Sequence, residues 1–267
     1  MATEPAKPGR ANEDYAGATT DTFVVVDGAG TPAGSESGCV HGVAWYARQL
    51  GAAMLHRATT EEGDLRDALA TAIADVADLH RDTCDLHHPG TPSATVTAAR
   101  MHDSRLEYLA LADSSLVIRS DDGVQIITDD RESQIGRWHR QRMDATAAGT
   151  REHTRALREY VETMRNHRNQ PGGFWVAASE PKAAQESVSG IIDTGAIRDI
   201  ALLTDGASRL VDRFDLTSWD AALDLIRDHG PNALIRAVRE AEATDAGGRR
   251  WPRGKTTDDA TVIYAKP

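Results

Sequence analysis

Three apolar, strand-like runs in this chain each end at an aspartate that is followed at once by a small residue. The runs cover residues 23–28, 109–114 and 200–206, and the aspartates are Asp27, Asp113 and Asp205. A further acidic pair, Asp258 and Asp259, stands just before a last apolar run at 260–264. If these strand ends meet at one edge of a core, at least four carboxylates lie together, and cations must offset their repulsion. The pattern therefore predicts a divalent metal site.

An ordinary turn explains any single one of these positions, because Asp-Gly after a strand is a common turn sequence. Three repetitions and a double aspartate, each beside a strand of the fully buried type, favour the metal site instead. Carboxylate oxygens with few histidine or cysteine partners suit hard ions. Magnesium or manganese is therefore expected rather than zinc.

Length and charge narrow the class of protein. With 267 residues, of which 40% are hydrophobic, the chain can bury a real core, and we expect one domain over residues 1–267. A formal net charge of -11 disfavours nucleic acid as a partner. The N-terminus lacks a signal peptide and no stretch is long enough to span a membrane, so a cytoplasmic protein is expected. The two cysteines, Cys39 and Cys84, form no disulfide framework.

The hydrophobic periodicity predicts an α+β fold. Helices are expected from Val40 to Met54, from near Thr60 to Leu79, within 130–170, and at 217–228 and 231–244. Strands are expected near 22–26, 94–101, 105–112, 115–120, 124–128, 174–178, 199–204 and 260–265, with an irregular loop at 28–34. Short polar turns between neighbouring strands imply antiparallel pairing. We therefore predict antiparallel sheets packed face to face with helices outside.

Six short segments, in this order, resemble the metal-dependent protein phosphatase family, also called the protein phosphatase 2C family, in its bacterial form. They are Asn12-Glu13-Asp14, Val25-Val26-Asp27-Gly28-Ala29-Gly30, Ser93-Ala94-Thr95, Ala112-Asp113-Ser114, Leu203-Thr204-Asp205-Gly206 and Asp258-Asp259-Ala260-Thr261-Val262. The resemblance spans nearly the whole chain. It implies a four-layer α-β-β-α sandwich with two central, mostly antiparallel sheets flanked by helices, which agrees with the periodicity.

The resemblance also implies roles for individual residues. Asp27 would bridge two Mn²⁺ or Mg²⁺ ions. The carbonyl of Gly28 and Glu13 would bind one ion, and Asp205 and Asp258 the other. The remaining implied roles are Asp14 acting through metal-bound water, Asp113 at a possible third ion, and Thr95 as a neutral hydrogen-bonding group nearby. Water held between the two ions would attack phosphorus, so Asp27, Asp205, Asp258, Asp14 and Arg10 are the expected catalytic set.

Three positions depart from the family pattern. The phosphate-binding arginine of the family usually stands four residues before the glutamate, whereas here Gly9 holds that place and Arg10 lies three before Glu13. Ala29 replaces the histidine that animal members carry after Asp-Gly. The Gly-Asp-Ser-Arg segment of the family reads Ala112-Asp113-Ser114-Ser115.

Histidines and cysteines offer two further interpretations. His80, Cys84, His87 and His88 could form a zinc site, although histidines near a helix C-terminus are also favourable through the helix dipole alone. Cys39 with His41 could serve as a thiol nucleophile, and His41 alone as a proton donor, but residues at the start of an amphipathic helix are more often packing groups.

The segment from Arg131 to Arg168 is rich in arginine. It holds nine arginines, five acidic residues and no lysine. We expect it to form a polar helical flap or insertion at about 130–170, where the resemblance implies a variable flap beside the active site. Arginine binds phosphate and carboxylate through two parallel hydrogen bonds, so the flap could recognise an acidic or phosphorylated substrate. The alternative is a solvated helix with internal ion pairs.

The expected function is hydrolysis of phosphomonoesters by a metal-dependent serine/threonine protein phosphatase. The substrate would be a phosphorylated protein or a small phosphorylated metabolite. The alternative is a catalytically weak relative that binds a phosphorylated partner and regulates it; the altered arginine spacing and Ala112 favour that alternative, and the intact set of Asp27, Asp205 and Asp258 disfavours it.

Overall fold

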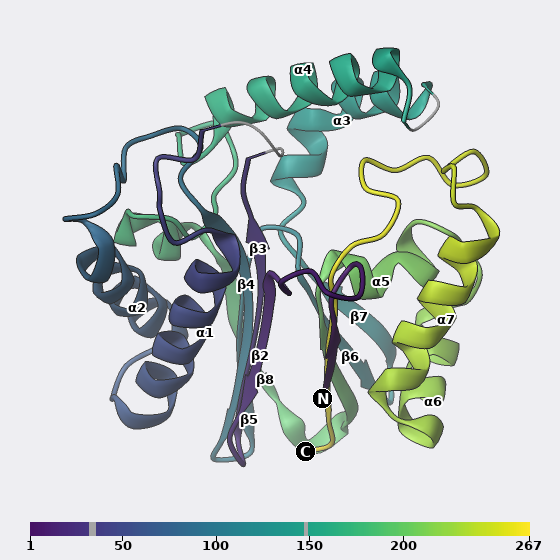
Figure 1. Cartoon of the computed structure of the whole chain (residues 1–267). Helices are drawn as coiled ribbons and strands as arrows, with labels where there is room; N and C mark the ends of the chain where they lie inside the picture. The colour runs from purple at the N-terminus through teal and green to yellow at the C-terminus, as the bar shows by residue number, and fades with distance from the viewer. Residues whose placement is uncertain (32–35, 147–148) are drawn as a thin grey trace.

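The computed structural model describes residues 1–31, 36–146 and 149–267, and two five-stranded antiparallel sheets lie at its centre (Figure 1). The first sheet has the order β2-β3-β4-β5-β8, and the second has the order β1-β10-β9-β6-β7. The strands are β1 Ala2–Glu4, β2 Asp14–Ala18, β3 Thr22–Ala29, β4 Ser93–His102, β5 Arg105–Leu111, β6 Ser115–Ser120, β7 Gly123–Ile127, β8 Val188–Asp193, β9 Ile197–Leu203 and β10 Ala260–Ala265.

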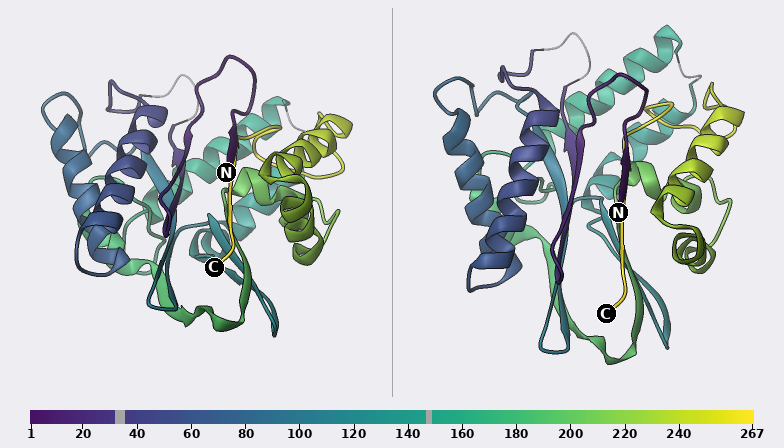
Figure 2. Two further views of the ribbon diagram at one scale, coloured as in Figure 1. Left: turned by 90° about the horizontal axis from the view of Figure 1, so that it is seen from below. Right: turned by 60° about the horizontal axis from the view of Figure 1, so that its bottom comes forward.

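Helices cover the outer face of each sheet, which gives the predicted four layers (Figure 2). The helices are α1 Val43–Thr60, α2 Leu65–His80, α3 Arg131–Asp144, α4 Arg151–His167, α5 Asp205–Asp212, α6 Trp219–His229 and α7 Pro231–Thr244, with short 3₁₀ turns at Pro181–Glu186 and Thr194–Ala196. Helices α1 and α2 pack on the first sheet, and α5, α6 and α7 pack on the second. The predicted α-β-β-α sandwich is confirmed.

Strand β3 shows why the apolar runs are continuous rather than alternating. Val24 and Val26 point outward into the core formed with α1 and α2, whereas Phe23 and Val25 point into the core between the two sheets. Since successive side chains of a strand face opposite ways, a strand covered on both faces needs apolar residues at every position. The end of such a strand is where an aspartate can first appear.

Helices α3 and α4 form the flap, which lies across one end of both sheets (Figure 1). Tyr160 and Met164 of α4 share a small apolar cluster with Phe174 and Val176. Gly136 of α3 faces this cluster, and a Cβ there would lie 2.8 Å from the Tyr160 ring. The flap is therefore joined to the rest of the molecule by a small apolar cluster.

Several expected boundaries were wrong. The helix predicted to open near Thr60 starts at Leu65, because Asp64 caps it by accepting a hydrogen bond from the Asp67 amide, while α1 continues through Thr60. Leu79, expected on its buried face, is exposed. Residues 174–178 are not a strand but make an isolated bridge from Ala177 to Ala94. Gly28 and Ala29 continue β3; the rest of the expected loop reaches residues 32–35, outside the described residues.

The short strands β1, β2 and β8 and helix α5 escaped prediction, because segments of three to eight residues carry little periodicity. Among the described residues, the helices are all too short or too polar to cross a lipid bilayer.

Candidate active site

A row of polar residues crosses three neighbouring strands of the first sheet. Asp14 of β2 is paired directly with Asp27 of β3, and Asp27 is paired with Thr95 of β4. Side chains of directly opposed residues on one face lie about 5 Å apart, and two like charges there repel each other. The register therefore places two carboxylates side by side where a cation would stabilise both.

Asp14 is buried, and its two carboxylate oxygens have different surroundings. The Thr204 hydroxyl donates a hydrogen bond to Oδ2 at 2.9 Å, whereas Oδ1 is buried without a hydrogen-bond partner among the described residues. Burial raises the pKa of Asp14 to about 8, against the effect of its hydroxyl neighbours. Oδ1 is thus an unsatisfied acceptor within an acidic group.

Asp205 brings a third carboxylate to the same place from the second sheet. It is the first residue of α5, directly after β9. Burial, and then the charges of Asp14, Asp205 and Asp258, hold the pKa of Asp27 well above its ordinary value. Burial also acts to raise the pKa of Asp205, but Arg209, Lys255 and a hydrogen bond from Asp27 keep it below its ordinary value. Asp27 and Asp205 therefore lie close enough to influence each other's charge.

Asp258 is the fourth carboxylate and is held by two cations. Arg209 donates to its Oδ2 at 2.9 Å, and Lys255 donates to its Oδ1 at 2.7 Å. Arg209 is buried and also binds Glu242 of α7 at 2.8 Å, whereas the Lys255 side chain is mostly exposed. Burial and the charge of Asp205 nevertheless raise the pKa of Asp258. The two cations compensate only part of the negative charge.

Asp259, the neighbour of Asp258, binds backbone amides of the N-terminal segment. Its carboxylate accepts hydrogen bonds from the backbone amides of Ala6 at 2.6 Å and Glu13 at 2.9 Å. Burial raises the pKa of Glu13. The charge of Lys255 acts against this rise, and the charge of Asp259 adds to it, so the Glu13 side chain lies near the same acidic group. Arg10 is exposed on the preceding loop, within electrostatic reach of Glu13. Asp259 therefore positions the N-terminal segment that carries Glu13.

The two Asp-Gly pairs of the acidic group, at 27–28 and 205–206, need glycine because another segment approaches closely. The Gly28 amide donates to the Glu13 carbonyl at 3.0 Å, and a Cβ on Gly28 would lie 2.5 Å from that oxygen. A Cβ on Gly206 would lie 1.9 Å from the Asp259 carbonyl oxygen. In each case, the segment pressed against the glycine carries an acidic residue of the group. The glycines are thus required by tertiary contact and not by a positive φ angle.

Asp113 follows β5 and joins the edge of the group. Burial, and then Glu132 and Asp205, raise its pKa well above the ordinary value, while Arg140 acts to lower it. The preceding Ala112 has φ of 64°, a left-handed conformation that costs a non-glycine residue about 1 kcal/mol. The backbone shape that the glycine of the family pattern would supply is therefore retained at this position.

The flap contributes Glu132, which sequence reasoning missed, and Arg140, one of the nine arginines of the segment. Arg140 donates to the Tyr160 hydroxyl at 3.0 Å, and that hydroxyl donates to Glu132 Oε1 at 3.1 Å. The charge of Arg140 also acts on Asp113 and Asp205. Nothing in the spacing of Glu132 indicated this position, since the flap meets the sheets only through tertiary packing. Thr95, as expected, lies beside the group and hydrogen-bonds to Ser114.

The donor set fits hard divalent cations. The group consists of carboxylates from four separate segments, with carbonyls nearby, and it includes the unsatisfied Oδ1 of Asp14. Oxygen donors of this kind suit Mg²⁺ and Mn²⁺. The structure thus brings together the predicted Glu13, Asp14, Asp27, Asp205 and Asp258, with Asp113 at their margin.

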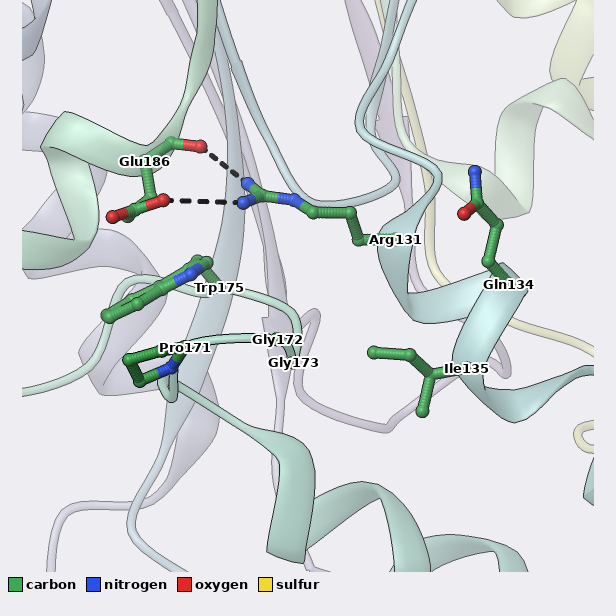
Figure 3. Close-up of a pocket in the computed structure, with 8 residues that line it drawn as sticks. All are labelled: Arg131, Gln134, Ile135, Pro171, Gly172, Gly173, Trp175 and Glu186. Carbon is green, nitrogen blue, oxygen red and sulfur yellow. Dashed lines mark hydrogen bonds and ion pairs between the residues drawn. The ribbon is translucent and has the colours of Figure 1, made fainter.

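A separate hollow of 460 Å³ lies beside the start of α3. Figure 3 shows Arg131 reaching across it to Glu186, with Trp175 and Pro171 on the far wall. Arg131 also binds the buried Asp129 at 2.7 Å. None of the acidic group lines this hollow, so it does not form the metal site.

Comparison with known proteins supports one family. A sequence model described as protein phosphatase 2C matches residues 4–231. A comparison with curated protein sequences gives no match.

Solved structures share the fold at low sequence identity. The serine/threonine phosphatase Stp1 from Staphylococcus aureus is 14% identical, with a TM-score of 0.61, covering 100% of this chain and 93% of that one. The phosphatase PstP/Ppp of Mycobacterium tuberculosis is 18% identical, with a TM-score of 0.58 and coverage of 99% and 96%. A PstP catalytic domain in complex with two manganese ions is 18% identical, with a TM-score of 0.56 and coverage of 99% and 95%.

Proposed function

Because this chain belongs to the protein phosphatase 2C family, we propose that it is a metal-dependent phosphatase that removes phosphate from phosphoserine and phosphothreonine in proteins. One observation carries the proposal: Asp14 and Asp27 are directly opposed, and Asp205 and Asp258 lie in the same buried group. An arrangement that repulsive is a stability cost unless it serves to bind cations. We take residues 1–267 as one phosphatase domain.

We assign the ligands as follows. Asp27 would serve both ions, Glu13 and the Gly28 carbonyl would help to hold one of them, and Asp205 and Asp258 would help to hold the other. Asp14, with its free Oδ1, would act through water, and Asp113 would belong to a third position. The neighbour with two manganese ions supports the number and the type of ion.

Bound divalent ions would lower the pKa of a water molecule so that it can act as the nucleophile, and would offset the negative charge of the phosphoryl oxygens. The residues of the chain do the rest. Arg209 is buried and fixes the orientation of Asp258, while the exposed Lys255 offsets part of the negative charge of Asp258. Arg10, on an exposed loop near Glu13, is our candidate for contact with the substrate phosphate.

Hydrolysis of para-nitrophenyl phosphate tests the function. We expect turnover with manganese and with magnesium, and loss of at least about 10²-fold with chelator, because both the nucleophile and the charge compensation require the ions. Metal binding by calorimetry is measured in parallel. Firm metal binding without turnover on this ester or on phosphopeptides would instead support the regulatory binder, and turnover unchanged by chelator would refute the proposal.

The flap supplies a substrate-selectivity prediction. Of its nine arginines, Arg140 is bound to Tyr160, and Arg142 and Arg155 pair with Glu159. At the ends of the segment, Arg131 pairs with Asp129 and Arg168 donates to the Pro89 carbonyl, while Arg165 is half-buried. Arg137, Arg151 and Arg158 are exposed, and the described residues provide no hydrogen bond or ion pair for their guanidinium groups. These three are free to meet an acidic or phosphorylated peptide.

Replacing Arg137, Arg151 and Arg158 together by glutamate should raise KM for a phosphopeptide by about 10-fold, since each exposed contact is worth several tenths of a kcal/mol. KM for the small aryl phosphate should change little. The matched control replaces Arg48, Arg105 and Arg236 by glutamate. These arginines are exposed outside the flap, so the control carries the same change in net charge. Equal effects of the two triple variants would contradict a role for the flap.

A further inference from the structure

A second group of metal-ligand side chains lies away from the acidic group. Cys39 and His41 stand on the segment just before α1, His80 is the last residue of α2, and Cys84 follows four residues later. One donor atom from each of the four lies within 4.8 Å of all the others. Cys84 is brought back towards His80 by a helical turn, its amide donating to the His80 carbonyl at 2.9 Å.

The distances between donor atoms match a tetrahedral zinc site. With Zn–S of about 2.3 Å and Zn–N of about 2.0–2.1 Å, a sulfur and a nitrogen at two corners lie about 3.6 Å apart, and two sulfurs about 3.8 Å apart. Cys84 Sγ is 3.4 Å from His41 Nδ1, and Cys39 Sγ is 3.8 Å from His41 Nδ1 and 3.6 Å from His80 Nδ1. The two sulfurs are 3.0 Å apart, so they need to separate by less than about 1 Å.

Packing already orients both imidazole rings. His41 stacks on Trp45 with ring centroids 4.3 Å apart and an interplanar angle of 23°, and Trp45 lies 5.2 Å from His80. His80 is 2% exposed, and its Nε2 is buried with no hydrogen-bond partner among the described residues. The polar contact of this ring within the described residues is therefore made by Nδ1, which faces Cys39 Sγ. A buried ring turned towards two thiols is poised to bind metal.

We propose that Cys39, His41, His80 and Cys84 bind one structural Zn²⁺ ion. Two thiolates and two neutral imidazoles compensate its charge, and these softer donors select zinc over manganese and magnesium. With four protein ligands, no position stays open for catalysis. This proposal keeps His80 and Cys84 from the zinc set considered in the sequence analysis, and it replaces His87 and His88 by Cys39 and His41. It also assigns Cys39 to metal binding and not to nucleophilic catalysis.

The ion would fix the segment that follows the strand of Asp27. Residues 36–42 lie between β3 and α1, and the amide of Asp85, five residues after the end of α2, donates to the Gly38 carbonyl at 2.8 Å. Joining Cys39 and His41 to His80 and Cys84 closes a link between segments about 40 residues apart. Such links stabilise the folded state chiefly by restricting the unfolded chain.

The test is the metal content of the full-length protein purified under reducing conditions and dialysed against a mild chelator. We expect one zinc ion per chain, retained after manganese has been removed, and released when the thiols are modified with a mercurial. Cobalt in the same site should give the intense visible absorption of tetrahedral thiolate ligation. None of these readouts depends on phosphatase activity, so the proposal can fail while the proposed function stands.

Variants locate the ion. Cys39→Ser and Cys84→Ser should lose nearly all zinc and show a lower thermal midpoint, whereas His87→Ala, an exposed neighbour, and Asp27→Asn, in the acidic group, should keep it. Zinc content far below one ion per wild-type chain, with or without a Cys39–Cys84 disulfide in non-reducing mass spectrometry, would overturn the proposal. Zinc retained by both serine variants, or lost equally in His87→Ala, would also overturn it.

Discussion

Asp27→Asn is expected to abolish manganese binding and to lower turnover of para-nitrophenyl phosphate by at least about 10³-fold, the equivalent of about 4 kcal/mol. Asp27 lies opposite Asp14 in the sheet and near Asp205 and Asp258, so it occupies the middle of the acidic group to which we assign the ions. An amide keeps the shape of the side chain but removes the charge that attracts the ions. Calorimetric titration with manganese and steady-state kinetics measure the two losses.

The fold should survive this change. Without metal, the variant should be at least as stable as the wild type, because a carboxylate that repels Asp14 has been removed. Manganese should raise the melting temperature of the wild type but not that of the variant. Asp122→Asn, in an exposed turn, is the matched control and should behave as the wild type. Near-normal activity of Asp27→Asn would refute the site.

Gly206→Ala is expected to weaken metal binding and to lower the free energy of unfolding by about 3 kcal/mol. The new methyl group would lie 1.9 Å from the Asp259 carbonyl oxygen, so the backbone at 258–259 must move, and overpacking of this kind typically costs 1–3 kcal/mol or occasionally more. That movement displaces Asp258 from Asp205, and it pulls on Asp259, whose carboxylate holds the Glu13 amide.

The comparison that isolates this clash is Gly195→Ala. Gly195 has open space around its Cα and no positive φ angle, so alanine should leave both stability and metal binding unchanged or slightly increase stability. Urea denaturation and manganese titration of the two variants measure both effects. If Gly206→Ala matched Gly195→Ala in both measurements, the close approach of Asp259 would not require glycine at position 206.

Much of the acidic site could be predicted from local sequence, because a strand buried on both faces leaves a continuous apolar run and its first carboxylate marks the edge of the sheet. Asp27, Asp113 and Asp205 were found in this way, and the apolar runs also indicated the two-sheet core. The ligand roles assigned to Glu13 and Asp14 came from the family resemblance. Short elements such as β2 and α5 contain too few residues for a clear periodic pattern and could not be found.

Other features depend on contacts between residues far apart in sequence. Asp258 and Asp259 are neighbours with the same side chain, yet one faces Arg209 and the other holds the Glu13 amide, a difference that only the packing of the N-terminal segment creates. In the proposed zinc site, Cys39, which precedes α1, lies beside His80 at the end of α2. The sequence by itself determined the layers and the strand-end carboxylates, since both follow from the burial of each segment. Only the tertiary structure decided which polar groups meet, because that depends on how the separate layers pack.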